Sequence, residues 1–200
     1  MMTLQSPYQN IAPENWAMVT DRLIAKHPLR SAEIVAIVLD AWQSIFASSI
    51  GSKGYKIGKD IFPKPQIMGA LLHELIPIEL TRRYPKEWRG EKAACDKDIV
   101  YLRDENFSIE LKTSSDRGKI FGNRSAAQKV KKDKKSKSGY YLAINFEKFS
   151  QQRTEPQIVL IRFGWLDHSD WIGQSAATGQ QSRLTSEIYA GKFKVLHIKS

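Results

Sequence analysis

One short segment of the chain holds an acid and a base at a spacing that could support chemistry. In segment 109–112, Glu110 and Lys112 are two residues apart within an apolar, strand-like run, so both side chains point to the same side of the strand. Asp98 lies twelve residues before Glu110 and opens a second apolar run. Carboxylate oxygens are ligands that Mg²⁺ prefers, and a bound metal polarises a phosphate and activates water. A lysine beside them would position the water and offset negative charge in the transition state. These three residues predict metal-assisted hydrolysis of a phosphodiester.

The spacing of an acid and a lysine two residues later is by itself weak, because it occurs often by chance. The chain contains it twice, at Glu110 and at Asp133. The second instance lies in a charged run, whereas the first lies in an apolar strand with Asp98 before it. The context therefore favours Glu110. An ordinary exposed hairpin with a salt bridge is the alternative interpretation of the same residues.

The charge of the chain is concentrated beside this segment. The 200 residues include 31 Lys and Arg against 21 Asp and Glu, a net charge of +10. Between Lys112 and Lys137 there are ten basic and two acidic residues, which gives +8 in 26 positions. The basic residues are Lys112, Arg117, Lys119, Arg124, Lys129, Lys131, Lys132, Lys134, Lys135 and Lys137. Such a local excess predicts contact with a polyanion, since each neutralised phosphate releases counterions. A solvated helix face is the alternative.

Length and composition narrow the class of protein. A chain of this length is typical of one domain, and 42% hydrophobic residues with 26% charged residues exclude a disordered or fibrous protein. The single cysteine, Cys95, excludes an internal disulfide and is expected to be a small buried residue. The four histidines show no zinc-ligand spacing. No signal peptide and no apolar run of membrane-spanning length is evident, so we expect a cytoplasmic protein.

The periodicity predicts an α/β fold. Helices are expected over 14–26, from Ser31 toward Gly51, and from about residue 66, where Pro77 should kink or end the helix. Strands are expected over 98–102, 107–112, 140–146 and 158–163. A helix should begin near residue 123 or 125 and end before Gly139. A long loop over 167–183 precedes a turn and a last strand.

The turn between the first two strands decides whether the acids and the lysine can meet. A three-residue loop suits its sequence, with 104–105 as a type I turn and Asn106 in the left-handed conformation. Arg103 would then face Phe107, and Asp98 would face Lys112, with Glu110 as a diagonal neighbour. The opposite face of this hairpin would belong to the core and carry Ile99, Tyr101, Ile109 and Leu111.

The residues described so far resemble a known family. Asp98 followed by segment 110–112, with Glu74 on a preceding helix, is similar to the PD-(D/E)xK nuclease superfamily. Segments 112–115, 120–125 and 162–167 look like those of type II restriction endonucleases, with a ScaI-like subgroup as the branch suggested. The resemblance covers about residues 66–185. Lys97 stands where the superfamily name has proline, and Asp96 is a rival to Asp98 as first metal ligand. We prefer Asp98 because an apolar strand follows it directly.

The resemblance implies a fold, a cofactor and a set of site residues. The fold would be a single domain over 1–200, with a helical N-terminal part over 1–65 and a catalytic core over 66–200 that contains a central mixed sheet and flanking helices. Mg²⁺ would be bound by Asp98, Glu110 and the Leu111 carbonyl, and Lys112 would be catalytic. Glu74 matches the additional helix acid of many members, although it is equally compatible with a plain surface position.

Further residues are expected to contact DNA. Several follow the proposed catalytic strand closely enough to reach phosphates or bases: Thr113, Ser114, Ser115, Lys119, Asn123 and Arg124. A helix cap at Asn123 or Ser125 is the alternative for that part. Gln180, Gln181 and Arg183 have the side chains suited to bidentate readout of adenine or guanine, although such residues are also ordinary on loops.

The sequence therefore predicts a Mg²⁺-dependent, sequence-specific endonuclease of restriction type that acts on double-stranded DNA. A palindromic site would require two related active sites and hence a homodimer. A repair or junction-resolving nuclease of the same fold is the first alternative. A non-catalytic DNA-binding protein, in which the basic segment makes the contacts and the acids are structural, is the second.

Overall fold

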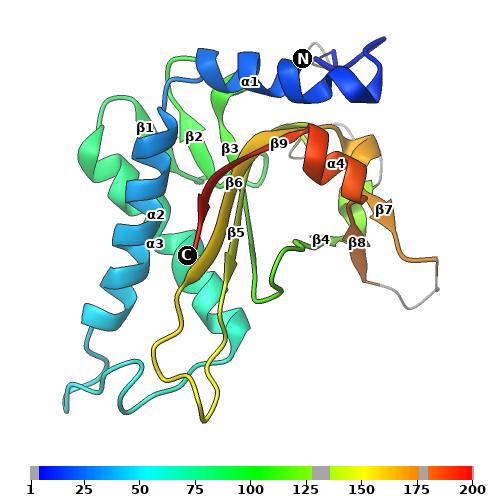
Figure 1. The fold of residues 1–200 in the computed structure, drawn as a ribbon. Helices are drawn as coiled ribbons and strands as arrows, with labels where there is room; N and C mark the ends of the chain where they lie inside the picture. The colour runs from blue at the N-terminus through cyan, green and yellow to red at the C-terminus, as the bar shows by residue number, and fades with distance from the viewer. Residues whose placement is uncertain (1–4, 128–135, 176–179, 200) are drawn as a thin grey trace.

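A six-stranded mixed sheet forms the centre of the protein in a computed structural model that describes residues 5–127, 136–175 and 180–199 (Figure 1). Its strand order is β1 (Trp88–Gly90), β2 (Ile99–Tyr101), β3 (Ile109–Ser114), β5 (Gly139–Phe146), β6 (Ile158–Leu166) and β9 (Phe193–Ile198). The β3–β5 pair is parallel and the other neighbours are antiparallel. The predicted α/β fold with a central mixed sheet and flanking helices is confirmed.

Two of the three long helices cover one face of this sheet, and the first lies across its end (Figure 1). The three are α1 (Trp16–Lys26), α2 (Ser31–Ala47) and α3 (Pro65–Arg83), and a 3₁₀ turn (Pro13–Asn15) precedes the first. Apolar residues at helical spacing bury one face of α2 and α3 against the odd-numbered residues of β2 and β3 and the even-numbered residues of β5. The hairpin residues predicted for the core, Ile99, Tyr101, Ile109 and Leu111, belong to this cluster, which confirms that prediction.

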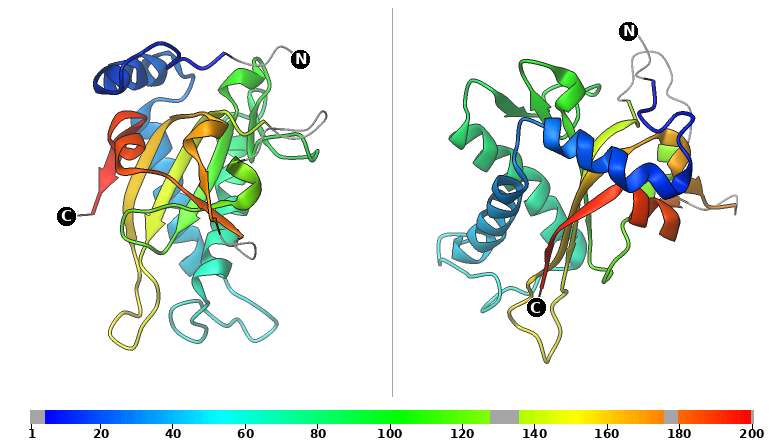
Figure 2. Two further views of the ribbon diagram at one scale, coloured as in Figure 1. Left: turned by 90° about the vertical axis from the view of Figure 1, so that its right-hand side faces the viewer. Right: turned by 45° about the horizontal axis from the view of Figure 1, so that its top comes forward.

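A smaller layer covers part of the opposite face, on the right in Figure 1 and toward the viewer in the left panel of Figure 2. It consists of α4 (Ser186–Gly191) and a three-stranded sheet in the order β4 (Gly122–Asn123), β8 (Gln181–Arg183), β7 (Ile172–Gly173). Because both faces of the main sheet are covered at its centre, all eight residues of β5 are buried. The long loop predicted over 167–183 is therefore wrong, since it supplies two strands and a 3₁₀ turn (His168–Asp170).

Helix α3 continues through Pro77 to Arg83, so of the kink or end predicted at that residue the end is wrong. Proline has no amide to donate to the preceding turn, and this loss is opposed by burial of the helix face around Leu72, Ile76 and Leu80. The Thr81 hydroxyl donates to the Pro77 carbonyl at 2.7 Å, which adds a hydrogen bond across the same turn. Tertiary packing overrides the local preference.

The segment that follows β3 differs from the predicted helix in its described part. It contains the two residues of β4 and a 3₁₀ helix (Arg124–Ala127), so the helix does not begin at residue 123 or 125 as predicted. Lys129, Lys131, Lys132, Lys134 and Lys135, half of the basic residues counted above, lie outside the described residues.

Cys95 is exposed, which contradicts the expectation of a buried thiol. Segment 91–97 folds around the carboxylate of Asp96, which accepts the amides of Lys92 and Ala93 at 2.9 and 3.1 Å. The Asp96 side chain thus occupies the interior of the bend and the thiol does not. Among the described residues, no helix is long and apolar enough to cross a membrane.

His27 ties the end of α1 to the β2–β3 connection. Its Nε2 donates to the Phe107 carbonyl at 3.1 Å, while Nδ1 accepts the Leu29 amide at 3.2 Å. The ring is buried among aromatic side chains, which include Tyr140 and Phe163. Burial lowers the pKa of His27 from 6.5 to about 4.

We expect this buried histidine to make the fold acid-sensitive between pH 6.5 and about 4. The unfolded chain binds a proton there that the folded chain does not, so the free energy of unfolding falls as the pH is lowered. Linkage gives a loss of about 2 kcal/mol between pH 7.5 and pH 5. Urea titrations at the two pH values measure it. A His27→Gln variant should lose this part of the pH dependence, whereas His197→Gln should retain it. An equal drop in both variants would contradict the assignment.

Candidate active site

Asp98, Glu110 and Lys112 share one face of the main sheet. Glu110 and Lys112 alternate with the core residues of β3, and they stand beside Tyr141 and Ala143 of the parallel neighbour β5. Ile99 pairs with Ile109, so continuation of the antiparallel pair places Asp98 beside Glu110. The predicted parity, on which the whole arrangement depends, is confirmed.

The register of this hairpin is shifted by two residues from the prediction. Residues 105–107 form a 3₁₀ helix, and the Asp104 carboxylate accepts the Asn106 amide at 3.0 Å. Asn106 does not adopt the left-handed conformation, so the three-residue loop is wrong. Arg103 therefore does not face Phe107, and Asp98 lies opposite Glu110 rather than Lys112. The shift brings the two carboxyl groups closer than the diagonal placement would have done.

The Lys112 ammonium joins the parts of this group. Its Nζ donates to Glu110 Oε1 at 2.8 Å and to the Leu111 carbonyl at 3.0 Å. The Leu111 amide in turn donates to Asp98 Oδ2 at 2.6 Å. If the β2–β3 ladder continued, a backbone carbonyl before β2 would accept the Leu111 amide. The Asp98 carboxylate takes the place of that carbonyl. The backbone amide and carbonyl of Leu111 thus connect Asp98 to Lys112, which in turn contacts Glu110.

The group is only partly open to solvent. Glu110 is 6% exposed, and a charged carboxylate at that depth requires a cation close by, which Lys112 supplies. The Tyr141 ring forms a wall of the site, with the ammonium groups of Lys112 and Lys97 at 5.9 and 5.3 Å from its centroid. Burial, followed by the negative charge of Glu110, holds the pKa of Tyr141 well above its usual range, so this phenol stays protonated.

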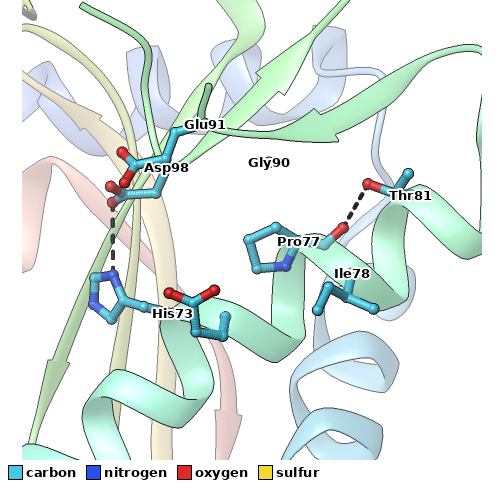
Figure 3. A pocket seen from close by; sticks show the side chains of 8 residues that line it. His73, Pro77, Ile78, Thr81, Gly90, Glu91 and Asp98 are labelled. Carbon is cyan, nitrogen blue, oxygen red and sulfur yellow. Dashed lines mark hydrogen bonds and ion pairs between the residues drawn. The ribbon is translucent and has the colours of Figure 1, made fainter. Parts of the chain in front are cut away.

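A cavity of about 160 Å³ opens beside Asp98, between α3 and the end of β1 (Figure 3). Glu74 and Asp98, two of the predicted metal ligands, both line it. The Glu91 side chain lies beside that of Asp98 on the sheet side, and His73 Nδ1 approaches Asp98 Oδ2 from α3 at 4.0 Å. Sequence reasoning missed His73 and Glu91. Neither has a spacing that signals the site, because the packing of α3 under the sheet brings His73 there and the pairing of β1 with β2 brings Glu91 there.

The structure separates Asp98 from its rival Asp96. The Asp96 carboxylate is bonded to Arg89 Nη1 at 2.6 Å as well as to the two amides of its own bend. The Arg89 guanidinium and these amides hold the pKa of Asp96 at about 2. Asp96 therefore has a structural function in segment 91–97, and Asp98 is the carboxylate that reaches β3.

The oxygens around Lys112 fit a divalent cation. In the described part of the chain, no group of three or more His, Cys, Asp or Glu side chains forms a metal cluster. The proposed set instead combines the carboxylates of Asp98 and Glu110 with the Leu111 carbonyl, all oxygen donors of the kind Mg²⁺ prefers. Two of these three already converge on one positive group, the Lys112 ammonium. The donors are thus arranged around a cation.

The residues predicted to contact DNA are partly half-buried near the end of β3 and partly exposed elsewhere. Thr113 lies on the helix side of β3, where a Cβ added to Gly69 of α3 would come within 2.7 Å of its hydroxyl oxygen. Ser114 accepts the Asp116 amide at 3.1 Å, and Ser115 is half-buried at the end of the strand. The remaining described members with exposed side chains are Lys119, Asn123, Gln180, Gln181 and Arg183. Arg124 begins the 3₁₀ helix after β4.

A buried network holds the loop that leaves the catalytic strand. Asn145 of β5 donates to the carbonyls of Asp116 and Lys119 at 2.8 and 2.9 Å. Arg162 of β6 donates to Asn145 at 2.9 Å, and its guanidinium lies 4.4 Å from the Tyr189 ring of α4. The Tyr189 hydroxyl receives the Ile120 amide at 2.9 Å. Loop 115–121, which carries Arg117 and Lys119, is therefore fixed from three elements that no sequence spacing connects.

The chain matches a known protein family over nearly its whole length. The family model for the ScaI restriction endonuclease matches residues 6–198. The curated type II restriction enzyme ScaI of Streptomyces caespitosus is 46% identical over 197 residues, which cover 98% of this chain and 86% of that protein. The chain belongs to the ScaI restriction endonuclease family. The match extends over the N-terminal helices as well as the proposed catalytic core.

Membership of the ScaI family confirms the predicted type of protein. A type II restriction endonuclease is a site-specific DNA endonuclease, and the predicted resemblance to such enzymes is confirmed. The repair nuclease and the non-catalytic DNA-binding protein, which the sequence alone left open, are thereby set aside. The comparisons do not assign the individual site residues, which rest on the geometry above.

Proposed function

We propose that this restriction endonuclease hydrolyses double-stranded DNA at the group formed by Asp98, Glu110 and Lys112. The Lys112 ammonium, which contacts both Glu110 and the Leu111 carbonyl, is the observation that supports the proposal most directly. The lysine thus contacts one acid of the motif, and the second acid, Asp98, accepts the Leu111 amide beside it at 2.6 Å. Their common face borders a cavity lined by further acidic side chains, where a cation and a phosphate would be accommodated.

Each residue has a separate task in this proposal. Asp98, Glu110 and the Leu111 carbonyl would hold Mg²⁺, with Glu74 near enough to contribute across the cavity. Bound there, Mg²⁺ would neutralise charge on the scissile phosphate and assist the ionisation of water. Lys112 would orient the attacking water and stabilise the charge that develops on the phosphate oxygens. The Leu111 amide keeps the Asp98 carboxylate aimed at β3.

We propose further that the enzyme acts as a homodimer on a palindromic site. One chain provides one group of this kind, and hydrolysis of both strands at equivalent positions requires a second group related by two-fold symmetry. Sedimentation equilibrium at the concentrations used for cleavage measures this directly. A monomer that cuts both strands in one binding event would contradict the dimer and leave the catalytic assignment intact.

Incubation of plasmid DNA with the purified protein tests the function. With Mg²⁺ we expect discrete fragments whose ends map to one sequence, and with EDTA we expect intact plasmid. Addition of excess Mg²⁺ to the EDTA sample should restore cleavage. Intact plasmid under all conditions would contradict the proposed activity, and equal cleavage with and without the chelator would contradict the metal requirement.

A further inference from the structure

We propose that the exposed face of the β4–β8–β7 sheet reads base edges of DNA, with Asn123, Gln181 and Arg183 as the residues that determine specificity. The inference rests on the proposed function and adds to it the element that selects the site. It begins with three strands of two or three residues each, of which β4 lies more than 45 residues before β7 and β8 in the sequence.

The register of this small sheet aligns the three side chains. Asn123 of β4 pairs with Gln181 of β8, and Arg183 of β8 pairs with Ile172 of β7. All four are exposed, whereas Ser182, between Gln181 and Arg183, is 1% exposed. Side chains alternate along a strand, so these four project from one face. Gln180 is also exposed, but it precedes β8, so the pairing of the small sheet does not align it with these four residues.

The other face of the small sheet is packed closely. A Cβ added to Gly122 would lie 2.7 Å from Ser182 Oγ and 3.1 Å from Trp171 Cε3, so only glycine allows this approach. The Ser182 hydroxyl donates to the Asn123 carbonyl at 3.0 Å, which ties β8 to β4 beneath the exposed residues. A reading surface must hold its side chains in fixed positions, and this buried face provides the support.

The packed face also connects the small sheet to the proposed active site. Trp171 immediately precedes β7 and its ring centroid is 5.9 Å from that of Tyr141. The Tyr141 ring is the one that the Lys112 ammonium contacts at 5.9 Å. Two side-chain contacts therefore separate the catalytic lysine from the strand that carries Ile172. The small sheet therefore packs beside the part of the main sheet that carries Lys112.

The chemistry of the four side chains fits base edges better than phosphates. Asn and Gln amides donate and accept at once, as the paired N6 and N7 of adenine require, and arginine donates twice to O6 and N7 of guanine. The Asn123–Gln181 pair therefore fits an A·T pair and Arg183 a G·C pair, while Ile172 offers an apolar contact to a thymine methyl. A surface for phosphates alone would instead be rich in lysine.

The test uses full-length protein and short duplexes that contain the site mapped with the wild-type enzyme. Further duplexes replace each base pair of that site in turn, and kcat/KM is measured on every duplex. Arg183→Ala should lower kcat/KM on the mapped site about 5- to 150-fold and abolish discrimination at one G·C pair. Asn123→Ala and Gln181→Ala should do the same at an A·T pair that both share.

Matched controls change the same residue types on exposed positions elsewhere. Gln151→Ala on the β5–β6 turn and Arg22→Ala on α1 should leave all rates unchanged. Variants of the small sheet that lower the rates on all duplexes by one common factor, or that cut like the wild type, would overturn the inference. That result leaves the nuclease assignment intact, because the site is mapped with wild-type enzyme first. Absence of wild-type cleavage would instead contradict the proposed function.

Discussion

Replacement of Glu110 by glutamine is expected to lower the rate of cleavage by about 10²- to 10³-fold while the fold and DNA binding persist. The two side chains have nearly equal volume, and the amide oxygen can still accept the hydrogen bond from Lys112 that the structure shows at 2.8 Å. What is lost is a negative charge at a position only 6% exposed, and with it one of the two carboxylate ligands of the proposed cation site. Loss of one such interaction in a transition state lowers a rate by about 10²- to 10³-fold.

Three measurements on Glu110→Gln separate catalysis from folding. Plasmid cleavage should fall by that factor, whereas the melting temperature should stay within a few degrees of the wild-type value. Affinity for a duplex with the mapped site should be retained or should rise, because the variant repels phosphate less. Asp21→Asn, which removes an exposed carboxylate bonded to Lys194 at 2.6 Å, is the matched control and should cut normally. A Glu110→Gln enzyme with near wild-type cleavage would refute the assignment.

The largest loss of stability is expected from Gly164→Ala in β6. Gly164 pairs with Phe193, and a Cβ at this position would lie 1.9 Å from the Lys192 carbonyl oxygen. The obstacle is backbone at the corner between α4 and β9, so no side-chain rotation relieves the overlap. Overpacking of this kind costs about 3 kcal/mol or more, which corresponds to a fall in melting temperature of about 10 °C for a domain of this size.

Thermal unfolding followed by circular dichroism measures this loss. Gly118→Ala is the control, since its added Cβ meets nothing within 4 Å and the hydrogen bonds of loop 115–121 involve backbone atoms that alanine retains. The control should melt within about 2 °C of the wild type. Equal melting temperatures for Gly164→Ala and the wild type would show that the corner at Lys192 can move freely, against the close approach described here.

The sequence predicts the β2–β3 hairpin well because the information that specifies it is local. Alternation of apolar and charged residues over 109–112 requires Glu110 and Lys112 to share a face, whatever the loop does. The loop itself was predicted incorrectly, because the Asp104 side chain caps a 3₁₀ turn that turn statistics for short hairpins do not describe. The error moved the register by two residues, which preserves parity and hence the composition of the site.

Features that depend on distant packing could not be predicted. Pro77 looks like a helix end until the burial of α3 against the sheet is known. Glu91 lies in a segment with no periodicity, and it lies beside Asp98 because it follows β1, whose pairing with β2 sets Gly90 opposite Ile99. The small sheet escapes detection for a related reason. Its strands are two or three residues long, too short for alternation to be visible, and β4 pairs with a segment about 60 residues later.

Residues near the N-terminus pack against residues near the C-terminus, so the fold depends on residues that are synthesised last. The buried ammonium of Lys192 bonds to Asp170 at 2.7 Å and lies 4.4 Å from the Tyr8 ring, while a Cβ on Gly191 would meet Trp16. Every residue of the proposed catalytic group leaves the ribosome before β8 and β9. A polypeptide released early therefore carries the hydrolytic residues without Arg183, but it also lacks the last strand of the main sheet and the anchor of its own N-terminus. A chain that ends before β8 therefore lacks both the residues proposed to select the DNA site and the residues that stabilise the fold.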